Sequence, residues 1–341
     1  MTGNEEFRRR VDDGPAREAA ELTLLVPVMN EEEAIPAFLE RVVPLLEKMD
    51  DPASGSFEIL FIDDGSRDET LSLIRAASAT DPRIGAISLS RNFGKEAALT
   101  AGLDHAQGKA VIPFDVDMQD PPEAIAEMLR KWREGNDIVY GVRTNRSSDS
   151  LPKRLTADLY YRAHNALSHD KIPEHAGDFR LLDRKVVEII KKMPERNRFM
   201  TGLFAWTGFR QAAVEYERAE REDGTSHFGY WKLWTLALDG LTSASTVPLR
   251  VWSYLGGLIA IGTLIFAGFI VAKTLITGID VPGYASLMVA VLFLGSVQLI
   301  SLGVLGEYVG RILREVKGRP IYIVGERIGE VADRRTESSH F

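Results

Sequence analysis

The chain of 341 residues has no cysteine, so disulfide bonds and metal sites built from thiolates are excluded. It has no excess of positive charge either. Its formal net charge is −8, which argues against a general nucleic-acid-binding protein, since such a protein presents a basic face. Residues 1–20 are charged and have no apolar stretch, so they lack the composition of a signal peptide and are expected to be flexible. Hydrophobic residues make up 45% of the chain, enough for a sizeable core.

Charge is also missing from two long stretches, residues 255–272 and 284–306. Each is close to the roughly 20 apolar residues that cross a membrane as a helix. The connection between them is too short to form a domain. We therefore predict a two-helix transmembrane hairpin over residues 253–310, with both ends on one side of the membrane. A pair of buried core helices is the alternative.

The charges that flank the two stretches predict their orientation. Arg250 precedes the first stretch, and the connection carries only Asp280, with Lys273 close to the end of the first stretch. Basic flanks stay in the cytoplasm, so the chain is predicted to be a multi-pass protein of the cytoplasmic (inner) membrane, with residues 311–341 as a basic cytoplasmic tail. The basic residues after the second stretch are Arg311, Arg314, Lys317 and Arg319.

Residues 230–252 are aromatic and amphipathic, with few acidic side chains. Tyr230, Trp231 and Trp234 suit a membrane interface, where rings with one polar end settle. The segment predicts amphipathic helices that lie against membrane lipids. An ordinary packing helix is the alternative.

Between residues 21 and 229, apolar β-branched runs alternate with helical patterns. This alternation predicts a cytoplasmic α/β domain whose sheet is mostly parallel, with helices on both faces. Ligands of such sheets bind beyond the carboxyl ends of the strands. The predicted strands are residues 22–28, 57–63, 84–90, 110–115 and 137–143, and the predicted helices are residues 32–49, 68–79 and 95–107.

Polar residues gather directly after these strands. The stretch Asp63-Asp64-Gly65-Ser66 follows the second strand and has two interpretations. It is either a turn that caps the next helix, which these residue types favour, or it supplies a carboxylate that hydrogen-bonds a base or a ribose.

Asp115 and Asp117 follow the fourth strand. In an extended segment, side chains two residues apart point the same way, so both carboxylates could meet one cation, and Gln119 could join them. Mg²⁺ typically takes one or two carboxylates together with substrate phosphates. The pattern therefore predicts a metal site. The alternative is a polar strand end followed by a helix that begins near Pro121.

Five motifs in this order, VPVMNEE, IDDGSRDET, RNFGKEAALTAGL, FDVDMQDPPE and GDFRL, resemble the family 2 glycosyltransferases, and among them those that use polyprenyl phosphates. The resemblance covers residues 22–324. It implies a Rossmann-like GT-A fold, a nucleotide-sugar donor, a polyprenyl phosphate acceptor, a divalent metal (Mg²⁺ or Mn²⁺) and a homo-oligomer such as a tetramer. The implied reaction is an inverting sugar transfer. Glucose from UDP-glucose is favoured, with galactose, mannose, N-acetylhexosamine and aminoarabinose left open.

The resemblance also implies roles for single residues. The implied metal ligands are Asp115, Asp117 and Gln119, and the implied catalytic residues are Asp115, Asp117 and Arg143. The expected donor-binding residues are Pro27, Asn30, Glu31, Asp63, Asp64, Lys95, Arg221 and Ser226. The expected acceptor-binding residues are Arg143, Arg154, Asp178 and Arg180. His227 departs from the family, which commonly has lysine at this place.

Two rival functions remain open. A processive polysaccharide synthase commonly has more spans and a Gln-x-x-Arg-Trp stretch, which this chain lacks. A transporter subunit with a nucleotide-binding domain tends to carry ionisable groups within the bilayer. The two uncharged stretches have none, and Gln298 is their most polar side chain.

Overall fold

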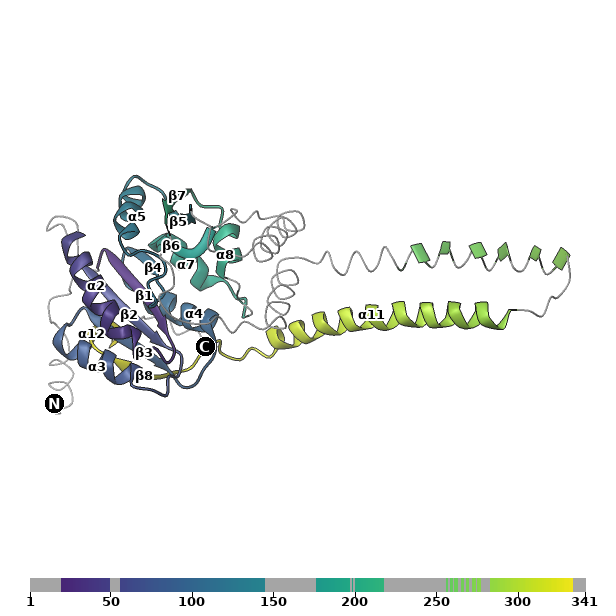
Figure 1. The fold of residues 1–341 in the computed structure, drawn as a ribbon, viewed down its shortest axis with the longest axis horizontal. Helices are drawn as coiled ribbons and strands as arrows, with labels where there is room; N and C mark the ends of the chain where they lie inside the picture. The colour runs from purple at the N-terminus through teal and green to yellow at the C-terminus, as the bar shows by residue number, and fades with distance from the viewer. Residues whose placement is uncertain are drawn as a thin grey trace, which may run out of the picture.

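The computed structural model describes residues 20–49, 56–144, 176–217 apart from 197 and 199, separate helical residues between 256 and 276, and 283–333. Within these residues the chain forms an α/β domain, and one long helix, α11 (Tyr284–Val316), projects from it (Figure 1).

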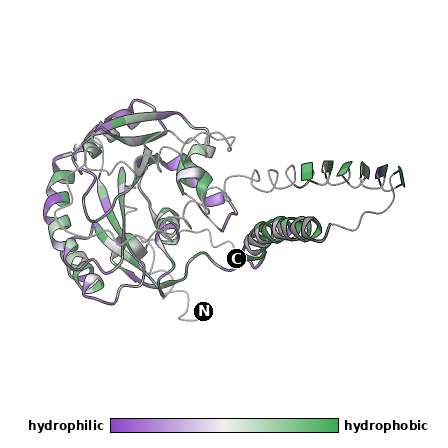
Figure 2. Cartoon of the chain, turned by 45° about the vertical axis from the view of Figure 1, so that its right-hand side comes forward, coloured by the Kyte–Doolittle hydropathy of each residue, from purple (hydrophilic) through white to green (hydrophobic). Residues whose placement is uncertain are grey.

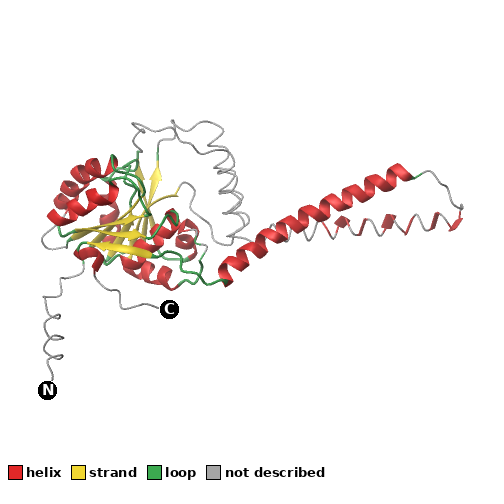
Figure 3. Cartoon of the chain, turned by 90° about the horizontal axis from the view of Figure 1, so that it is seen from below, coloured by secondary structure: helices red, strands yellow, loops and turns green. Residues whose placement is uncertain are grey.

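The described residues contain an eight-stranded sheet in the order β7-β5-β6-β4-β1-β2-β3-β8. Its strands are drawn in yellow in Figure 3. Strands β1 to β5 and β7 run in one direction, and β6 and β8 run against their neighbours. The prediction of a mostly parallel sheet is therefore confirmed. The strands are β1 (Leu22–Val28), β2 (Phe57–Asp63), β3 (Ile84–Leu89), β4 (Ala110–Pro113), β5 (Ile138–Arg143), β6 (Ala176–Asp183), β7 (Gln211–Tyr216) and β8 (Val324–Ile328).

Two hydrophobic cores, one on each face of the sheet, hold the helices in place. Side chains alternate along a strand, so Leu24 and Val26 of β1 belong to one core and Leu25 belongs to the other. The first face is covered by α2 (Ala34–Met49), α3 (Thr70–Thr80) and α5 (Ala124–Arg133). The second face is covered by α4 (Lys95–His105), α7 (Arg184–Lys192), α8 (Met200–Trp206) and α12 (Glu330–Asp333).

The chain returns to the sheet after α11. Strand β8 pairs antiparallel with β3, and α12 places Val331 in the core of the second face. Part of the segment predicted as a basic tail, residues 311–341, is thus an edge strand and a helix of the α/β domain. Chain segments from both sides of the predicted hairpin meet in one sheet.

Helix α11 exposes apolar side chains along its length. Figure 2 shows much of this helix in the green of hydrophobic residues. Leu299 is 71% exposed and Val316 is 77% exposed. Among the described residues, one helix is long and apolar enough to cross a membrane, Phe293–Val316 within α11. The other predicted span, residues 255–272, is described only at separate helical residues, so the two-helix hairpin is not confirmed.

Candidate active site

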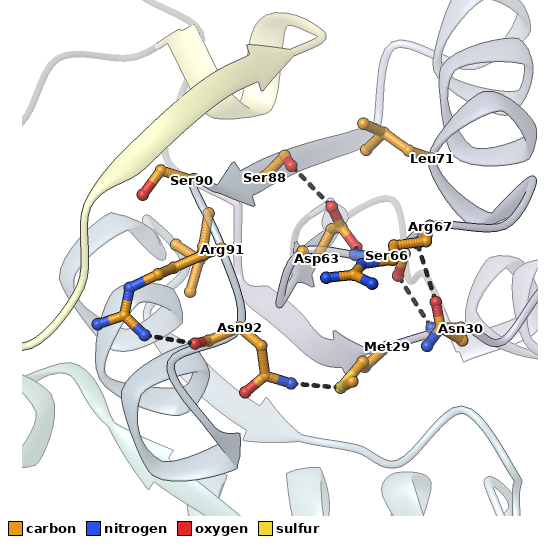
Figure 4. A pocket seen from close by; sticks show the side chains of 12 residues that line it. Met29, Asn30, Asp63, Ser66, Arg67, Leu71, Ser88, Ser90, Arg91 and Asn92 are labelled. Atoms are coloured by element: carbon orange, nitrogen blue, oxygen red, sulfur yellow. Dashed lines mark hydrogen bonds between the residues drawn. The ribbon is translucent and has the colours of Figure 1, made fainter.

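Loops at the carboxyl ends of β1, β2 and β3 surround a cleft of about 460 Å³ (Figure 4). Asn30 follows β1, Asp63 ends β2, and Ser88 lies near the end of β3. This is the edge where open α/β sheets bind ligands. Arg67 and Arg91 also line the cleft, and two cations suit an anionic ligand such as a diphosphate.

The loops after β1 and β2 are tied together by Asn30. Its φ of 55° is left-handed, a conformation that asparagine tolerates better than most residues. Its backbone N–H donates to Ser66 Oγ at 2.9 Å, and its Oδ1 accepts from the N–H of Arg67 at 2.9 Å. The N–H of Glu31 donates to Thr70 Oγ1 at 2.8 Å. Asn30 and Glu31, both predicted donor-binding residues, therefore also fix the shape of this rim.

Asp63 lines the cleft and is only 1% exposed. Its Oδ1 accepts from the N–H of Ser66 at 2.9 Å, and its Oδ2 accepts from Ser88 Oγ at 2.7 Å. Each carboxylate oxygen can accept more than one hydrogen bond. The carboxylate is thus held in one orientation at the cleft by the loop after β2 and by β3, and its predicted contact with the donor stays a prediction.

Asp64 shapes the next loop along the edge. It is 4% exposed, and its two oxygens accept from the backbone N–H groups of Phe93 at 2.7 Å and Gly94 at 2.8 Å. The following residue must be glycine, because Gly65 has a φ of 76° and a Cβ there would lie 2.7 Å from the carbonyl carbon of Arg91. Asp64 therefore organises the loop that leads into α4. Its predicted contact with the donor stays a prediction.

Asp115 and Asp117 lie on a turn rather than in an extended segment. Strand β4 ends at Pro113, and the N–H of Met118 donates to the carbonyl of Asp115 at 3.2 Å. Met118 has a φ of 49°. The alternation of an extended chain does not apply here, so that basis for the predicted metal site was wrong.

The two carboxylates have different surroundings. Asp115 forms an ion pair with Lys95 Nζ at 2.9 Å, and Lys95 is the first residue of α4. Asp117 is exposed, and its Oδ1 accepts from the N–H of Gln119 at 3.2 Å. Lys95 thus contacts one of the predicted metal ligands, Asp115. Gln119, the third predicted ligand, contributes its backbone N–H to the turn.

A divalent metal fits this turn only together with a ligand. The described residues contain no group of three or more acidic and histidine side chains that could hold a metal ion. Asp115 and Asp117 nevertheless offer two solvent-accessible carboxylates on one turn, and Mg²⁺ commonly combines two carboxylates with substrate phosphates. The residues therefore fit a cation shared with a bound diphosphate.

Arg143 ends β5 beside a buried polar pair. Its Nε donates to the hydroxyl oxygen of Tyr216 at 3.3 Å, and the Tyr216 hydroxyl donates to Asp120 Oδ1 at 2.6 Å. A guanidinium nitrogen of Arg143 lies 3.7 Å from Asp120 Oδ1. Burial, followed by the charge of Asp120, raises the pKa of Tyr216 to about 12, so the hydroxyl stays protonated and donates at neutral pH.

The remaining predicted residues are placed as follows. Arg180 of β6 is buried, with its guanidinium carbon 4.6 Å from the centre of the Phe204 ring, which makes it a core residue as well as an acceptor candidate. Asp178 lies on the same strand, and Pro27 is half-buried within β1. Predictions for Arg154, Arg221, Ser226 and His227, and for the interfacial segment 230–252, lie outside the described residues.

Several residues that line the candidate site have no role in the predictions from the sequence. Arg67 and Arg91 belong to the motifs quoted above and line the cleft. Because they lie in the loops that follow β2 and β3, their sequence positions indicate the ligand-binding edge of the sheet. Ser88 lies within the predicted strand 84–90, which indicates no functional role for it. Tyr216 had no visible signal, because the strand that carries it was not predicted.

Comparison with known proteins identifies the family. The model for "Glycosyl transferase family 2" matches residues 23–190. A prophage-derived bactoprenol glucosyl transferase of Shigella flexneri is 52% identical over 303 residues, which is 89% of this chain and 97% of that protein. A glycosyltransferase of Synechocystis sp., named as uncharacterized, is 50% identical over 309 residues, 91% of this chain and 96% of that protein. The chain belongs to glycosyl transferase family 2.

Likeness in three dimensions is weaker. A mannosyltransferase of Pyrobaculum calidifontis, solved in complex with GDP-Man and Mn²⁺, is 17% identical, with a TM-score of 0.40 over 87% of this chain and 93% of that one. At this score the likeness adds nothing to the assignment, which rests on the sequence matches. Members of this family transfer sugars. The cleft and the turn that carries Asp115 and Asp117, called the acidic turn below, are therefore candidates for one sugar-transfer site.

Proposed function

We propose that the protein transfers a sugar from a nucleotide-sugar donor to a polyprenyl phosphate at the cytoplasmic face of the membrane. Glucose from UDP-glucose is the first candidate donor. Relatives at 52% identity, matched over 97% of their own length, are named bactoprenol glucosyl transferases, and this supports both the acceptor and the sugar. The predicted homo-oligomer stays a prediction.

One structural observation carries the proposal: a short connection joins the apolar helix to the rim of the cleft. Helix α11 ends at Val316 and β8 begins at Val324, which pairs with Leu89. The N–H of Ser90 donates to the carbonyl of Ile323 at 2.9 Å, and both Leu89 and Ser90 line the cleft. Seven residues reach at most about 25 Å, so the cleft lies near the end of an apolar helix. This suits an acceptor that is dissolved in a membrane.

The sheet also supports two membrane crossings. β7 precedes α11 in the chain and β8 follows it, and both strands belong to one sheet. If α11 crosses a membrane once, the chain must cross a second time between β7 and α11 for β8 to return to that sheet. The uncharged residues 255–272 are the segment suited to this crossing. A multi-pass protein with a cytoplasmic catalytic domain is thus part of the proposal.

The proposed reaction needs no protein base. The second pKa of a phosphate monoester is about 6, so a lipid phosphate is largely dianionic at neutral pH. One of its oxygens forms a bond to the anomeric carbon while the bond from that carbon to the nucleoside diphosphate breaks. The diphosphate leaves with the bonding electrons, and the configuration inverts. The protein's task is to bring two anionic groups together, and Arg67, Arg91 and Arg143 are cations suited to this.

A divalent ion, Mg²⁺ or Mn²⁺, is proposed at Asp115 and Asp117. When bound, it would neutralise charge on the leaving diphosphate. Asp115, which forms an ion pair with Lys95 in this structure, would bind the metal ion instead. Lys95 would then be available to interact with the phosphates of the donor.

A product assay tests the proposal. Purified protein is given a panel of nucleotide sugars with a short-chain polyprenyl phosphate, and the products are weighed by mass spectrometry. We expect a single sugar–phosphate–lipid product, formed best from UDP-glucose and abolished by a chelator. Asp117→Ala should lose most of the turnover and keep the unfolding midpoint of the wild type, because Asp117 is exposed. Transfer to an unphosphorylated polyprenol, or full activity of Asp117→Ala in chelator, would contradict the scheme.

A further inference from the structure

Arg143 and Tyr216 lie side by side across two parallel strands. They are register partners in the pairing of β5 with β7, and paired residues of neighbouring strands project from the same face. Gly141 lies two residues before Arg143, on that same face. A Cβ at Gly141 would lie 2.5 Å from the ring of Tyr216, so the ring fills the space that a side chain at Gly141 would need. The strand is therefore built to accept this tyrosine beside Arg143.

The ring alone does not explain a tyrosine at this position. Its aromatic packing, 5.6 Å between its centre and that of Phe179, would be met equally by phenylalanine. The hydroxyl is what contacts Arg143 and Asp120. A buried hydroxyl requires such partners, so the polar tip has a role distinct from the packing of the ring.

Asp120 connects this pair to the acidic turn. It lies three residues after Asp117, its side chain is 14% exposed, and it accepts from Tyr216 at 2.6 Å while its Oδ1 lies 3.7 Å from the Arg143 guanidinium. The turn that carries the proposed metal ligands is thereby fixed to the ends of β5 and β7.

We propose that Tyr216 and Asp120 are positioning residues that hold the Arg143 guanidinium toward the phosphate of the lipid acceptor. The inference rests on the proposed function, which supplies the acceptor. Arginine is a long side chain with many rotamers, so fixing it in one orientation costs conformational entropy. A hydroxyl and a carboxylate that restrain it before substrate arrives lower the cost of binding, so they act on acceptor affinity.

Tyr216→Phe in the full-length protein tests the inference, since it keeps the ring and removes the hydroxyl. Hydrogen bonds to charged groups are worth enough that we expect the KM for a short-chain polyprenyl phosphate to rise about tenfold, with kcat and the donor KM within about twofold of the wild type. Calorimetric binding of farnesyl phosphate should weaken by a similar factor. Tyr140→Phe, on the same strand as Arg143, is the matched control and should leave these constants unchanged.

Asp120 variants separate positioning from packing. Asp120→Asn keeps an oxygen that accepts from Tyr216 and should retain most of the acceptor affinity, whereas Asp120→Ala should lose at least as much as Tyr216→Phe. Wild-type acceptor KM in Tyr216→Phe would overturn the inference. So would an equal loss for donor and acceptor that accompanies a lowered unfolding midpoint. If the wild type transfers no sugar to lipid phosphates, the proposed function fails, and farnesyl phosphate binding to the same variants still decides the positioning role.

Discussion

Asp63 and Asp64 are adjacent and both buried, yet their hydrogen bonds differ in kind. Asp63 accepts from one backbone N–H and from the hydroxyl of Ser88. Asp64 accepts from two backbone N–H groups, those of Phe93 and Gly94. A hydroxyl can reverse and become an acceptor, whereas a backbone N–H can only donate. Replacement by asparagine should therefore change the stability of the protein differently at the two positions.

Asp64→Asn is expected to destabilise the protein more than Asp63→Asn. At position 64 the amide NH₂ must face an N–H group, and leaving a buried donor unmatched costs about 1–3 kcal/mol. At position 63 the NH₂ can donate to Ser88, so we expect the stability to change by less than about 1 kcal/mol. Thermal unfolding of the two purified variants measures the difference. Equal unfolding midpoints would show that Asp64 does not hold the loop before α4.

At the scale of elements, the strands that are buried on both faces were predictable from the sequence, and the exposed edge strand was not. β1 and β2 coincide with predicted strands, because buried parallel strands read as continuous apolar runs. β8 has the sequence VGERI, with two charged residues, since an edge strand is covered on one side only. Its partner β3 lies more than 200 residues earlier in the chain, and no local pattern reports such a pairing.

The candidate site was predictable in part for a related reason. In a parallel sheet the carboxyl ends of the strands share one edge, so Asn30, Asp63 and Arg143 could be assigned to that edge from strand positions alone. The turn at residues 115–118 depends on a left-handed Met118, which sequence does not reveal. Tyr216 depends on the pairing of β7 with β5, which is also not local.

The end of α4 carries a histidine that should make the fold sensitive to acid. His105 is buried against the ring of Tyr322, and burial, followed by the charges of Arg327 and Lys191, lowers its pKa to about 4. A helix C-terminus favours a protonated histidine by only about 0.3–1 kcal/mol, so burial prevails. Unfolding restores an ordinary pKa near 6.5, and the unfolded state then binds the extra proton.

Stability from His105 is therefore complete above pH 6.5 and is lost as the pH falls toward 4. Linkage gives a loss of about 2 kcal/mol at pH 5 relative to pH 7. The unfolding midpoint of the wild type should fall more steeply over this range than that of His105→Gln, whose side chain does not titrate. Parallel curves for the two proteins would show that His105 is protonated equally in both states.

At the scale of the whole molecule, helix α11 and the α/β domain are fastened together at several points. The N–H of Arg196, between α7 and α8, donates to Glu315 Oε1 at 2.8 Å in the last turn of α11. The hydroxyl of Tyr322 donates to Asp104 Oδ2 at 2.9 Å on α4. Together with the pairing of β8 and β3, these contacts hold the C-terminal end of α11 against the domain. The direction of the helix therefore determines the direction in which the cleft faces.

Topology then follows from connectivity. Because β7 and β8 share one sheet, any membrane crossings of the chain between them must be even in number. The basic residues after the apolar part of α11 favour the cytoplasm for that side, where the proposed nucleotide-sugar donor would reach the cleft.

Reporter fusions test this arrangement. A reporter placed after Phe341 and one placed before Met1 should both read cytoplasmic, and one inserted in residues 277–283 should read external. Replacing the four basic residues Arg311, Arg314, Lys317 and Arg319 by glutamine should reduce the fraction of correctly oriented protein, because these charges set the orientation. Opposite readings at the two termini would require an odd number of crossings, which one sheet containing both β7 and β8 cannot accommodate. External readings at both termini would separate the cleft from cytoplasmic donors and refute the proposed reaction at that face.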